Sequence, residues 1–197
     1  GYAMTEDLLI RHAAPTLAGL KTANLVNCRC DSVNKLLSAL SSLNRRLGSK
    51  GVRVMPLRVW DGRALVYIYR PQRLQADLKG DHAGRLLESR GYSRGTPGRC
   101  MMQLMERLSS GGEFPHEIGL FLGYPPEDVE GFIRNKAECS KCCGHWKVYG
   151  DEHRARDLFK RYNQCTQVYC AQWMAGKSLE DLTVQIGQTN KMRRSIA

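Results

Sequence analysis

The stretch that decides the fold is VRVMPLRVWDGRALVYIYR, residues Val52–Arg70. Residues 52–60 and 63–70 are rich in Val, Leu, Ile and Tyr, and Asp61-Gly62 separates them. A two-residue Asp-Gly connection favours the type I′ turn that joins antiparallel strands, so the stretch predicts a β-hairpin. Pro56 has no backbone N–H to donate to a neighbouring strand, so we expect the first strand at an edge of its sheet.

A segment upstream of the hairpin has the period of an amphipathic helix. We expect Asp31 to cap this helix and Gly48 to end it. Its apolar residues recur at the spacing that places them on one helix face, namely Val33, Leu36, Leu37, Leu40, Leu43 and Leu47. An earlier helix is expected to begin at Thr5 and to end at Pro15, whereas residues 16–30 show no decisive pattern.

Downstream of the hairpin the sequence predicts mainly helices, near residues 72–79, 81–90, 99–109, 115–122, 126–135 and 151–175. A third strand is expected at about residues 145–149. We therefore predict an α+β fold, dominated by helices. It is expected to form a single domain over residues 1–197, with a flexible basic tail at about 188–197.

The net charge of +11 is concentrated in the first half of the chain. Residues 1–100 contain 17 basic and 7 acidic side chains, whereas residues 101–150 contain 5 and 7. Such a basic surface keeps a protein soluble and also suits anionic ligands or nucleic acid. No apolar run approaches the ~18–20 residues of a membrane span, and the N-terminus lacks a secretory pattern. We therefore expect a cytoplasmic protein without a membrane partner.

Eight cysteines in a chain expected in the cytosol indicate free thiols, packed thiols or metal ligands rather than disulfides. The sharpest pattern is CSKCCGH, which runs from Cys139 to His145. Its Cys-x-x-Cys spacing can supply half of a tetrahedral zinc site or an iron–sulfur site. The candidate metal ligands are Cys139, Cys142, Cys143 and His145, and the alternative is a set of ordinary thiols.

The candidate catalytic residues are His116, Glu117 and Cys143. His116 and Glu117 are expected at a helix start, where the helix dipole favours a neutral imidazole that can act as a base or a ligand. Cys143, followed by Gly144 and His145, supplies the thiol that a thiolate–imidazole pair needs. In the structural alternative, Glu117 complements the helix dipole and His116 has no chemical role.

The candidate ligand-binding residues are Lys21, Lys147 and Tyr149. Each lysine lies among apolar neighbours. It can bind an anion at a pocket wall, or it can keep its ammonium group in water while its stem packs. The glycine-rich motifs that bind phosphates are absent from the sequence. Aromatic residues do not interleave with basic residues in an RNA-binding signature.

Residues Phe114–Ile133, FPHEIGLFLGYPPEDVEGFI, have the spacing of a helix-turn-helix, with Gly123 at the turn. The second helix carries Glu127, Asp128 and Glu130, and these carboxylates would be repelled by the phosphates of DNA. We therefore expect a structural corner at this position, and a DNA-binding regulator stays an alternative.

Three stretches together resemble an uncharacterised bacterial protein family that is catalogued only as a domain of unknown function. They are HAAPTLAGLKTANLVN (His12–Asn27), the stretch Phe114–Ile133 quoted above, and GHWKVYGD (Gly144–Asp151). The resemblance spans nearly the whole chain and implies one cytosolic bacterial protein of about this size. It implies no reaction, cofactor or catalytic residue.

The sequence therefore predicts a small-molecule- or anion-binding protein, or an enzyme, with a pocket that uses His116 and nearby Cys and Lys residues. Two alternatives remain at this point. One is a nucleic-acid-associated regulator that uses the helix-turn-helix, and the other is a cysteine-rich interaction module that holds zinc or iron.

Overall fold

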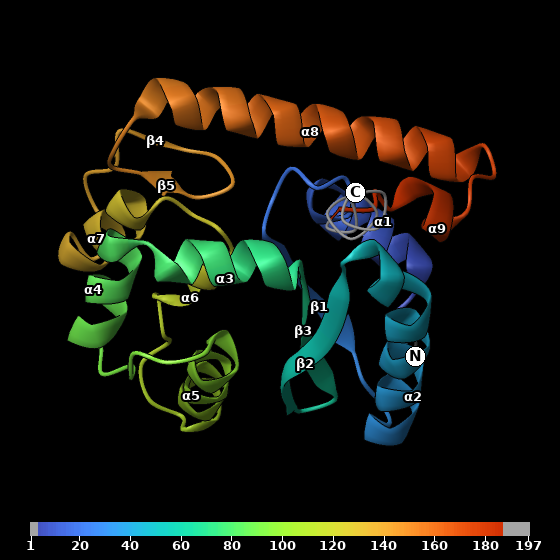
Figure 1. The fold of residues 1–197 in the computed structure, drawn as a ribbon, viewed down its shortest axis with the longest axis horizontal. Helices are drawn as coiled ribbons and strands as arrows, with labels where there is room; N and C mark the ends of the chain where they lie inside the picture. The colour runs from blue at the N-terminus through green and yellow to red at the C-terminus, as the bar shows by residue number, and fades with distance from the viewer. Residues whose placement is uncertain (1–3, 187–197) are drawn as a thin grey trace, which may run out of the picture. The chain divides into compact units, whose positions relative to one another are not determined.

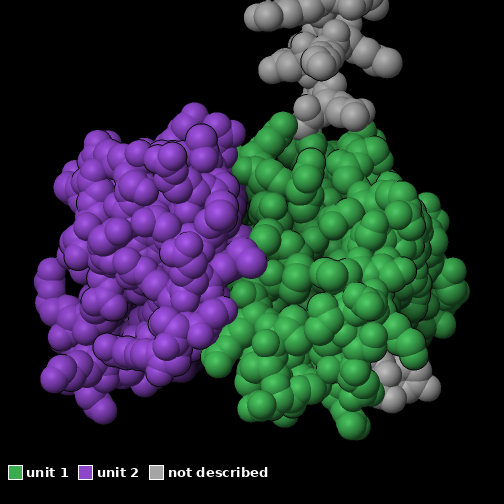
Figure 2. All heavy atoms as spheres, turned by 90° about the horizontal axis from the view of Figure 1, so that it is seen from below, with its two compact units in different colours: residues 1–72, 165–197 green, residues 73–164 purple. Residues whose placement is uncertain are grey.

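The computed structural model describes residues 4–186, and these form two compact units (Figure 2). Among these residues, unit 1 consists of residues 4–72 and 165–186, and unit 2 consists of residues 73–164. The predicted basic tail lies outside the described residues. The predicted α+β class, dominated by helices, is confirmed (Figure 1). No helix among residues 4–186 combines the length and the apolar character that crossing a membrane requires.

Unit 1 contains a three-stranded antiparallel sheet in the order β1-β3-β2. The strands are β1 (Ala23–Arg29), β2 (Arg53–Trp60) and β3 (Arg63–Tyr69). The predicted hairpin is confirmed, and β2 is an edge strand with a bulge between Pro56 and Arg58. The third strand of this sheet is β1, in the segment for which the sequence showed no decisive pattern.

Two long helices of unit 1 begin at capped residues. In α1 (Glu6–Leu17), the Thr5 hydroxyl accepts a hydrogen bond from the Leu8 N–H, as predicted. Helix α2 (Val33–Leu47) is capped by Ser32 rather than by Asp31, because the Ser32 hydroxyl accepts from the Lys35 N–H. The expectation that α1 ends at Pro15 is wrong by two residues, since a proline near the last turn removes little helical hydrogen bonding.

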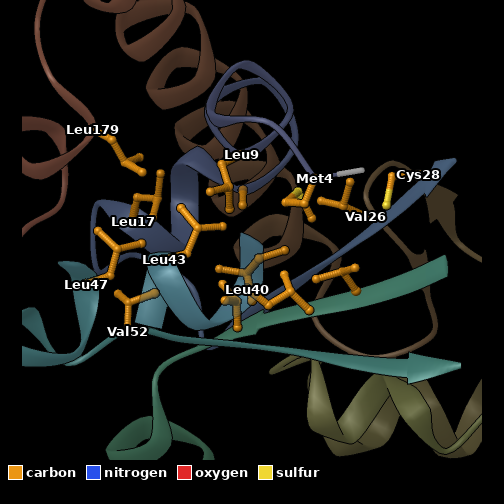
Figure 3. Close-up of a cluster of buried hydrophobic side chains, with 14 of the residues drawn as sticks. Met4, Leu9, Leu17, Val26, Cys28, Leu40, Leu43, Leu47, Val52 and Leu179 are labelled. Carbon is orange, nitrogen blue, oxygen red and sulfur yellow. The ribbon is translucent and has the colours of Figure 1, made fainter. Parts of the chain in front are cut away.

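The core of unit 1 lies between one face of the sheet and the helices that cover it (Figure 3). Leu36, Leu40, Leu43 and Leu47 of α2 are buried there, as is Leu179 of the short helix α9 (Leu179–Leu182). The predicted stripe of α2 is therefore confirmed at four positions. Its other two members, Val33 and Leu37, are about half exposed.

Arg70 joins segments of unit 1 that are far apart in the sequence. Its guanidinium is buried and donates to the carbonyl oxygens of Thr16 at 2.8 Å and of Leu17 at 2.8 Å. It also donates to Lys50 in the turn η1 (Gly48–Lys50) at 3.0 Å, and to Val184 at 2.7 Å. One planar cation thus satisfies backbone oxygens of three chain segments, which is the geometry that arginine provides and lysine does not.

Unit 2 is built from helices of 4 to 23 residues and one small hairpin. The helices are α3 (Pro71–Lys79), α4 (Asp81–Ser89), α5 (Pro97–Ser109), α6 (Ile118–Phe121), α7 (Pro126–Arg134) and α8 (Glu152–Met174), of which α3 and α8 include the unit boundaries. The predicted strand at 145–149 is present as β5 (Lys147–Val148), but it pairs with β4 (Cys142–Cys143) in a separate sheet.

Candidate ligand-binding site

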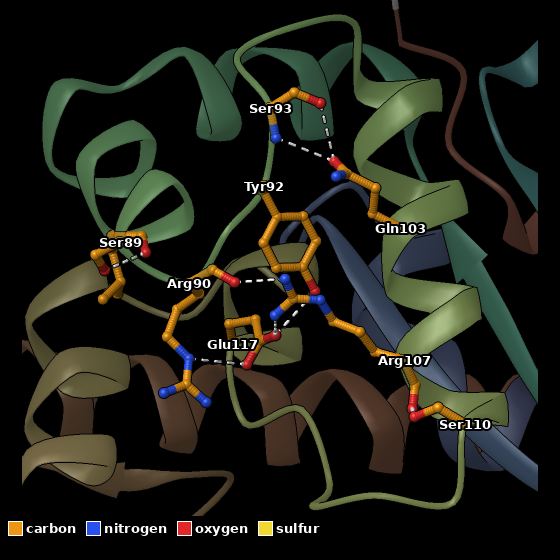
Figure 4. Close-up of polar contacts among 9 residues, drawn as sticks. Ser89, Arg90, Tyr92, Ser93, Gln103, Arg107, Ser110 and Glu117 are labelled. Atoms are coloured by element: carbon orange, nitrogen blue, oxygen red, sulfur yellow. Dashed lines mark hydrogen bonds and ion pairs between the residues drawn. The ribbon is translucent and has the colours of Figure 1, made fainter.

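Glu117 is the centre of a buried polar network in unit 2 (Figure 4). It precedes α6, and its side chain is only 1% exposed. Its Oε1 accepts hydrogen bonds from the hydroxyl of Tyr92 and from Nη1 of Arg107, each at 2.9 Å. A carboxylate so deeply buried needs such partners, because an unpaired charge in the protein interior is costly.

The second oxygen of Glu117 is not hydrogen-bonded. Arg90 Nε lies 3.6 Å from Glu117 Oε2 as an ion pair, and neither atom has a hydrogen-bond partner within the described part of the chain. Arg107 also donates to the carbonyl oxygen of Arg90, and its guanidinium lies 4.2 Å from the centre of the Tyr92 ring. The network therefore holds one carboxylate between two guanidinium groups and fixes the Tyr92 ring from two sides.

Burial raises the pKa of the Tyr92 hydroxyl, and the negative charge and hydrogen bond of Glu117 raise it further. Tyr92 is therefore a neutral hydrogen-bond donor at physiological pH, and its proton is directed at Glu117. This leaves the ring of Tyr92, rather than its hydroxyl, as the part that can face a ligand.

Tyr92 lines a cavity of about 240 Å³ within unit 2, and because Tyr92 is 3% exposed we call it and the other buried lining residues the floor of the cavity. Leu87 of α4 and Cys100 of α5 are the other buried residues of this floor. Gly84 and Gly95 also line the cavity, and glycine leaves space that a side chain would occupy. Ligand sites are concave and largely apolar, with a few polar groups at the edge, and this cavity has that composition.

The rim of the cavity carries four charged side chains of both signs. Glu88 and Arg94 form an ion pair with each other. Lys79 and Asp81 also line the cavity, and neither forms an ion pair with another residue between positions 4 and 186. Asp81 lies in the first turn of α4, where its charge complements the helix dipole. Lys79 is the last residue of α3, where its positive charge likewise complements the helix dipole.

The cavity also receives the N-terminus of α5. Pro97, the first residue of this 13-residue helix, lines the cavity, and Thr96 caps the helix by accepting from the Arg99 N–H. The positive end of the helix dipole and the Lys79 ammonium each favour an anionic group in the cavity. The thiol of Cys100 donates weakly to the Ser93 carbonyl oxygen at 3.7 Å, and burial raises its pKa. Cys100 is therefore a neutral thiol and a poor nucleophile.

His116 and Glu117 are adjacent in the chain but have separate environments. The His116 ring packs against Phe114 and Phe132, with ring centres 5.6 and 5.0 Å apart. Glu117 belongs to the buried network, and neither residue lines the cavity. The contacts of Cys143 are those of the β4–β5 hairpin, so a site shared by His116 and Cys143 stays a prediction.

Lys147 and Tyr149 hold a loop of the backbone. Lys147 Nζ donates to the carbonyl oxygen of Ala137 at 2.7 Å, and the Tyr149 hydroxyl donates to that of Glu138 at 2.8 Å. The loop needs this support because Ala137 and Cys139 have positive φ values of 64° and 60°, a region that favours glycine. These contacts support a structural role for two residues predicted to bind a ligand.

Lys21 follows α1 in unit 1 and is 5% exposed. Burial lowers the pKa of its ammonium group to about 8. It therefore lies in a different unit from the cavity and from the other predicted site residues.

No three of the predicted metal ligands Cys139, Cys142, Cys143 and His145, all among the described residues, form a group that can hold a metal ion. No group of three or more His, Cys, Asp or Glu residues between positions 4 and 186 has an arrangement that can hold a metal ion. His145 shows why, since its Nε2 is 2.8 Å from Asn163 Oδ1 and its ring packs against Phe159 and Tyr162. All eight cysteines are free thiols.

Asp128 explains why the second helix of the predicted helix-turn-helix is a structural element. Its buried carboxylate accepts hydrogen bonds from Trp146 Nε1 and from the backbone N–H groups of Tyr149 and Gly150, at 2.8 to 2.9 Å. Glu130 of the same helix contacts His82 and Arg134. The carboxylates of α7 thus serve contacts within unit 2, and two of the three stretches that carry the family resemblance meet at Asp128.

The segment Gly91–Gly98, which is rich in Gly, Ser and Pro, and the helix ends beside it form much of the cavity wall. Local pattern identifies glycine and proline positions but not the distant floor residues that they face. Clustered glycines beside a capped helix start were the one signal in the sequence that pointed to this place.

A family model described as "Protein of unknown function (DUF3793)" matches residues 9–183 of the chain, which confirms the predicted family resemblance. Neither the curated proteins nor the solved structures contain a match.

Proposed function

The chain belongs to the DUF3793 family, and we propose that it is a binding protein that holds a small organic anion in the cavity of unit 2. The observation that carries this proposal is the buried network of Glu117, which fixes the side chain of Tyr92, a buried residue that lines the cavity. A preformed aromatic floor reduces the ordering that a ligand must impose, and this favours affinity.

The chemistry of the cavity suggests how such a ligand would lie. Its apolar part would rest on Leu87 and the Tyr92 ring, away from water. Its carboxylate or phosphate would face Lys79 and the N-terminus of α5. The cavity supports binding rather than covalent chemistry, because the thiol at its floor is protonated.

The helix-turn-helix regulator has less support, because α7 directs Asp128 into unit 2, pairs Glu130 with His82 and Arg134, and leaves Glu127 exposed. The two carboxylates of this short helix that are not buried, those of Glu127 and Glu130, oppose a phosphate backbone.

A fragment screen by ligand-observed NMR tests the proposal. The panel pairs small aromatic and aliphatic carboxylates and phosphates with their neutral amides and alcohols. We expect anions to bind more tightly than their neutral analogues, and Lys79→Met to remove this preference. Lys35→Met, an exposed helical lysine of unit 1, is the matched control and should change nothing.

Gly84→Leu provides the steric arm of the test. Gly84 lies in α4, it lines the cavity, and a Cβ atom placed there meets no atom within 4 Å. A leucine therefore enters open space without disturbing the helix, and it should block every ligand that the cavity accepts. Binding that survives Gly84→Leu would place the ligand elsewhere and overturn the proposal.

A further inference from the structure

One face of the sheet in unit 1 ends in a patch of basic and aromatic side chains. Residues directly opposite each other on paired strands point to the same face. The register pairs Arg29 with Arg63 and Arg63 with Trp60, and in the next row Leu65 pairs with both Asn27 and Arg58. These rows form what we call the sheet-end patch, whose polar and aromatic members are Asn27, Arg29, Arg58, Trp60 and Arg63.

The bulge in β2 creates this patch. Before the bulge, Val54 and Pro56 are paired on the face that carries the core. Strict alternation would place Arg58 and Trp60 on that same face. The extra residue, Leu57, shifts the register so that Arg58 and Trp60 join the opposite face beside Arg63. A bulge that redirects two side chains in this way is a specific feature of a strand rather than a defect.

Contacts within the patch arrange its groups for stacking and for phosphate binding. The Arg58 guanidinium lies 4.8 Å from the centre of the Trp60 ring. Arg63 Nε donates to Asn27 Oδ1 at 3.2 Å. Asn27, Arg29 and Arg63 are exposed. An aromatic ring with guanidinium groups around it can stack a base while it holds the neighbouring phosphates.

The charges of the patch are not balanced by ion pairs. Like charges directly opposite each other on paired strands destabilise a sheet, yet Arg29 faces Arg63. Across residues 4–186, none of the patch arginines forms an ion pair with a carboxylate. Two acidic residues lie near the patch in the sequence: Asp31, two residues after Arg29, and Asp61, which occupies the hairpin turn with a φ of 42°. A bound polyanion would relieve the repulsion between the arginines.

We propose that the sheet-end patch binds single-stranded nucleic acid, with a base stacked on Trp60 and phosphates on Arg29, Arg58 and Arg63. Single strands fit this surface because their bases can be turned out to stack, whereas a duplex keeps its base faces covered. The proposal concerns unit 1 alone. It is independent of the anion cavity in unit 2, and either proposal can fail without the other.

Fluorescence anisotropy with the full chain tests the proposal, using labelled dT12, U12 and a 12-base-pair duplex at 50 to 200 mM salt. We expect both single strands to bind, and the duplex to bind at least about fivefold more weakly. Trp60→Leu should weaken binding at least about fivefold, since stacking contributes roughly 1–3 kcal/mol per base. A base stacked on Trp60 should also quench the fluorescence of this tryptophan. Trp60→Phe should keep most of the affinity and remove this quenching.

A double variant reports on the phosphate contacts. Arg29→Gln with Arg63→Gln should reduce the slope of log affinity against log salt by about 1.4, the value for two lost contacts to a single strand. The control, Arg154→Gln with Arg156→Gln, removes the same charge from exposed positions of α8 and should leave the slope unchanged. Far-UV circular dichroism checks that each variant is folded.

Three results would overturn the proposal. One is the absence of binding at 50 mM salt. The second is an equal loss of affinity in the control double variant, which would indicate attraction to net charge alone. The third is a duplex or heparin bound as tightly as dT12 with no effect of Trp60→Leu, which would indicate a general polyanion surface without stacking.

Discussion

The indole N–H of Trp146 donates a hydrogen bond of 2.8 Å to Oδ2 of Asp128, and this bond joins the segment before α8 to the first turn of α7. The other carboxylate oxygen of Asp128 accepts from the backbone N–H groups of Tyr149 and Gly150. One buried side chain therefore satisfies three donors, so its removal should lower the stability of unit 2.

We predict that Asp128→Ala lowers the free energy of unfolding by about 3 kcal/mol or more, because it leaves three N–H donors without an acceptor. Urea denaturation followed by tryptophan fluorescence measures this effect. Glu127→Ala, at an exposed neighbouring position, should change stability by no more than about 0.5 kcal/mol. Equal effects of the two substitutions would contradict the role assigned to Asp128.

The Glu117 network should respond to both charge and shape. Glu117→Ala is expected to cost about 3 kcal/mol of unfolding free energy, because it removes a buried acceptor from Tyr92 and Arg107. Glu117→Gln keeps the shape of the side chain but replaces the charged carboxylate next to Arg90 with a neutral amide. We expect it to lower the free energy of unfolding by about 2 kcal/mol.

Thermal and urea denaturation measure the two variants of Glu117. Glu106→Ala, at an exposed site on α5, is the control and should leave the free energy of unfolding nearly unchanged. If Glu117→Gln were as stable as the parent chain, the charge of Glu117 would have no part in holding Tyr92.

Much of the fold was predictable because it depends on local pattern. The Asp61-Gly62 turn specified the β2–β3 hairpin, and the leucine period specified α2. Strand β1 was not predictable in this way, because its partner β3 lies about 40 residues downstream and only that pairing defines it. The same reason applies to Glu117, whose donors Tyr92 and Arg107 lie 25 and 10 residues away.

Lys21 should make stability depend on pH. Its folded-state pKa is about 8 instead of the ordinary 10.5, so between these values the unfolded chain binds more protons. The free energy of unfolding should therefore rise with pH above about 8, by up to about 1.4 kcal/mol per pH unit. Urea denaturation at pH 7.0 to 9.5 measures this rise.

Lys21→Met should abolish the rise and should be more stable than the parent at pH 7, where the parent buries a charged ammonium group. Lys35→Met, at an exposed position on α2, should retain the slope. If the free energy of unfolding of Lys21→Met still rose with pH in this range, the rise would come from another titratable group.

Two glycines on helices should respond in opposite directions to the same substitution. At Gly84 of α4 a methyl group meets nothing, so Gly84→Ala should stabilise unit 2 by about 0.5–1 kcal/mol through helix propensity. At Gly131 of α7 the new Cβ would lie 2.4 Å from Cβ and Cγ of Tyr149. Gly131→Ala should therefore destabilise by about 1–3 kcal/mol. Urea midpoints that moved in the same direction would contradict this packing.

The division of unit 1 into two chain segments has a consequence for biosynthesis. Leu179 and Leu182 complete its core, and the carbonyl oxygen of Val184 accepts a hydrogen bond from Arg70. On the ribosome these residues follow the whole of unit 2, which is one uninterrupted segment and can mature while the chain is still growing. Until these residues are made, the first segment of unit 1 exposes the apolar surface that Leu179 and Leu182 later cover. A nascent chain stalled near residue 164 should therefore be a substrate for chaperones rather than a half-finished but stable protein.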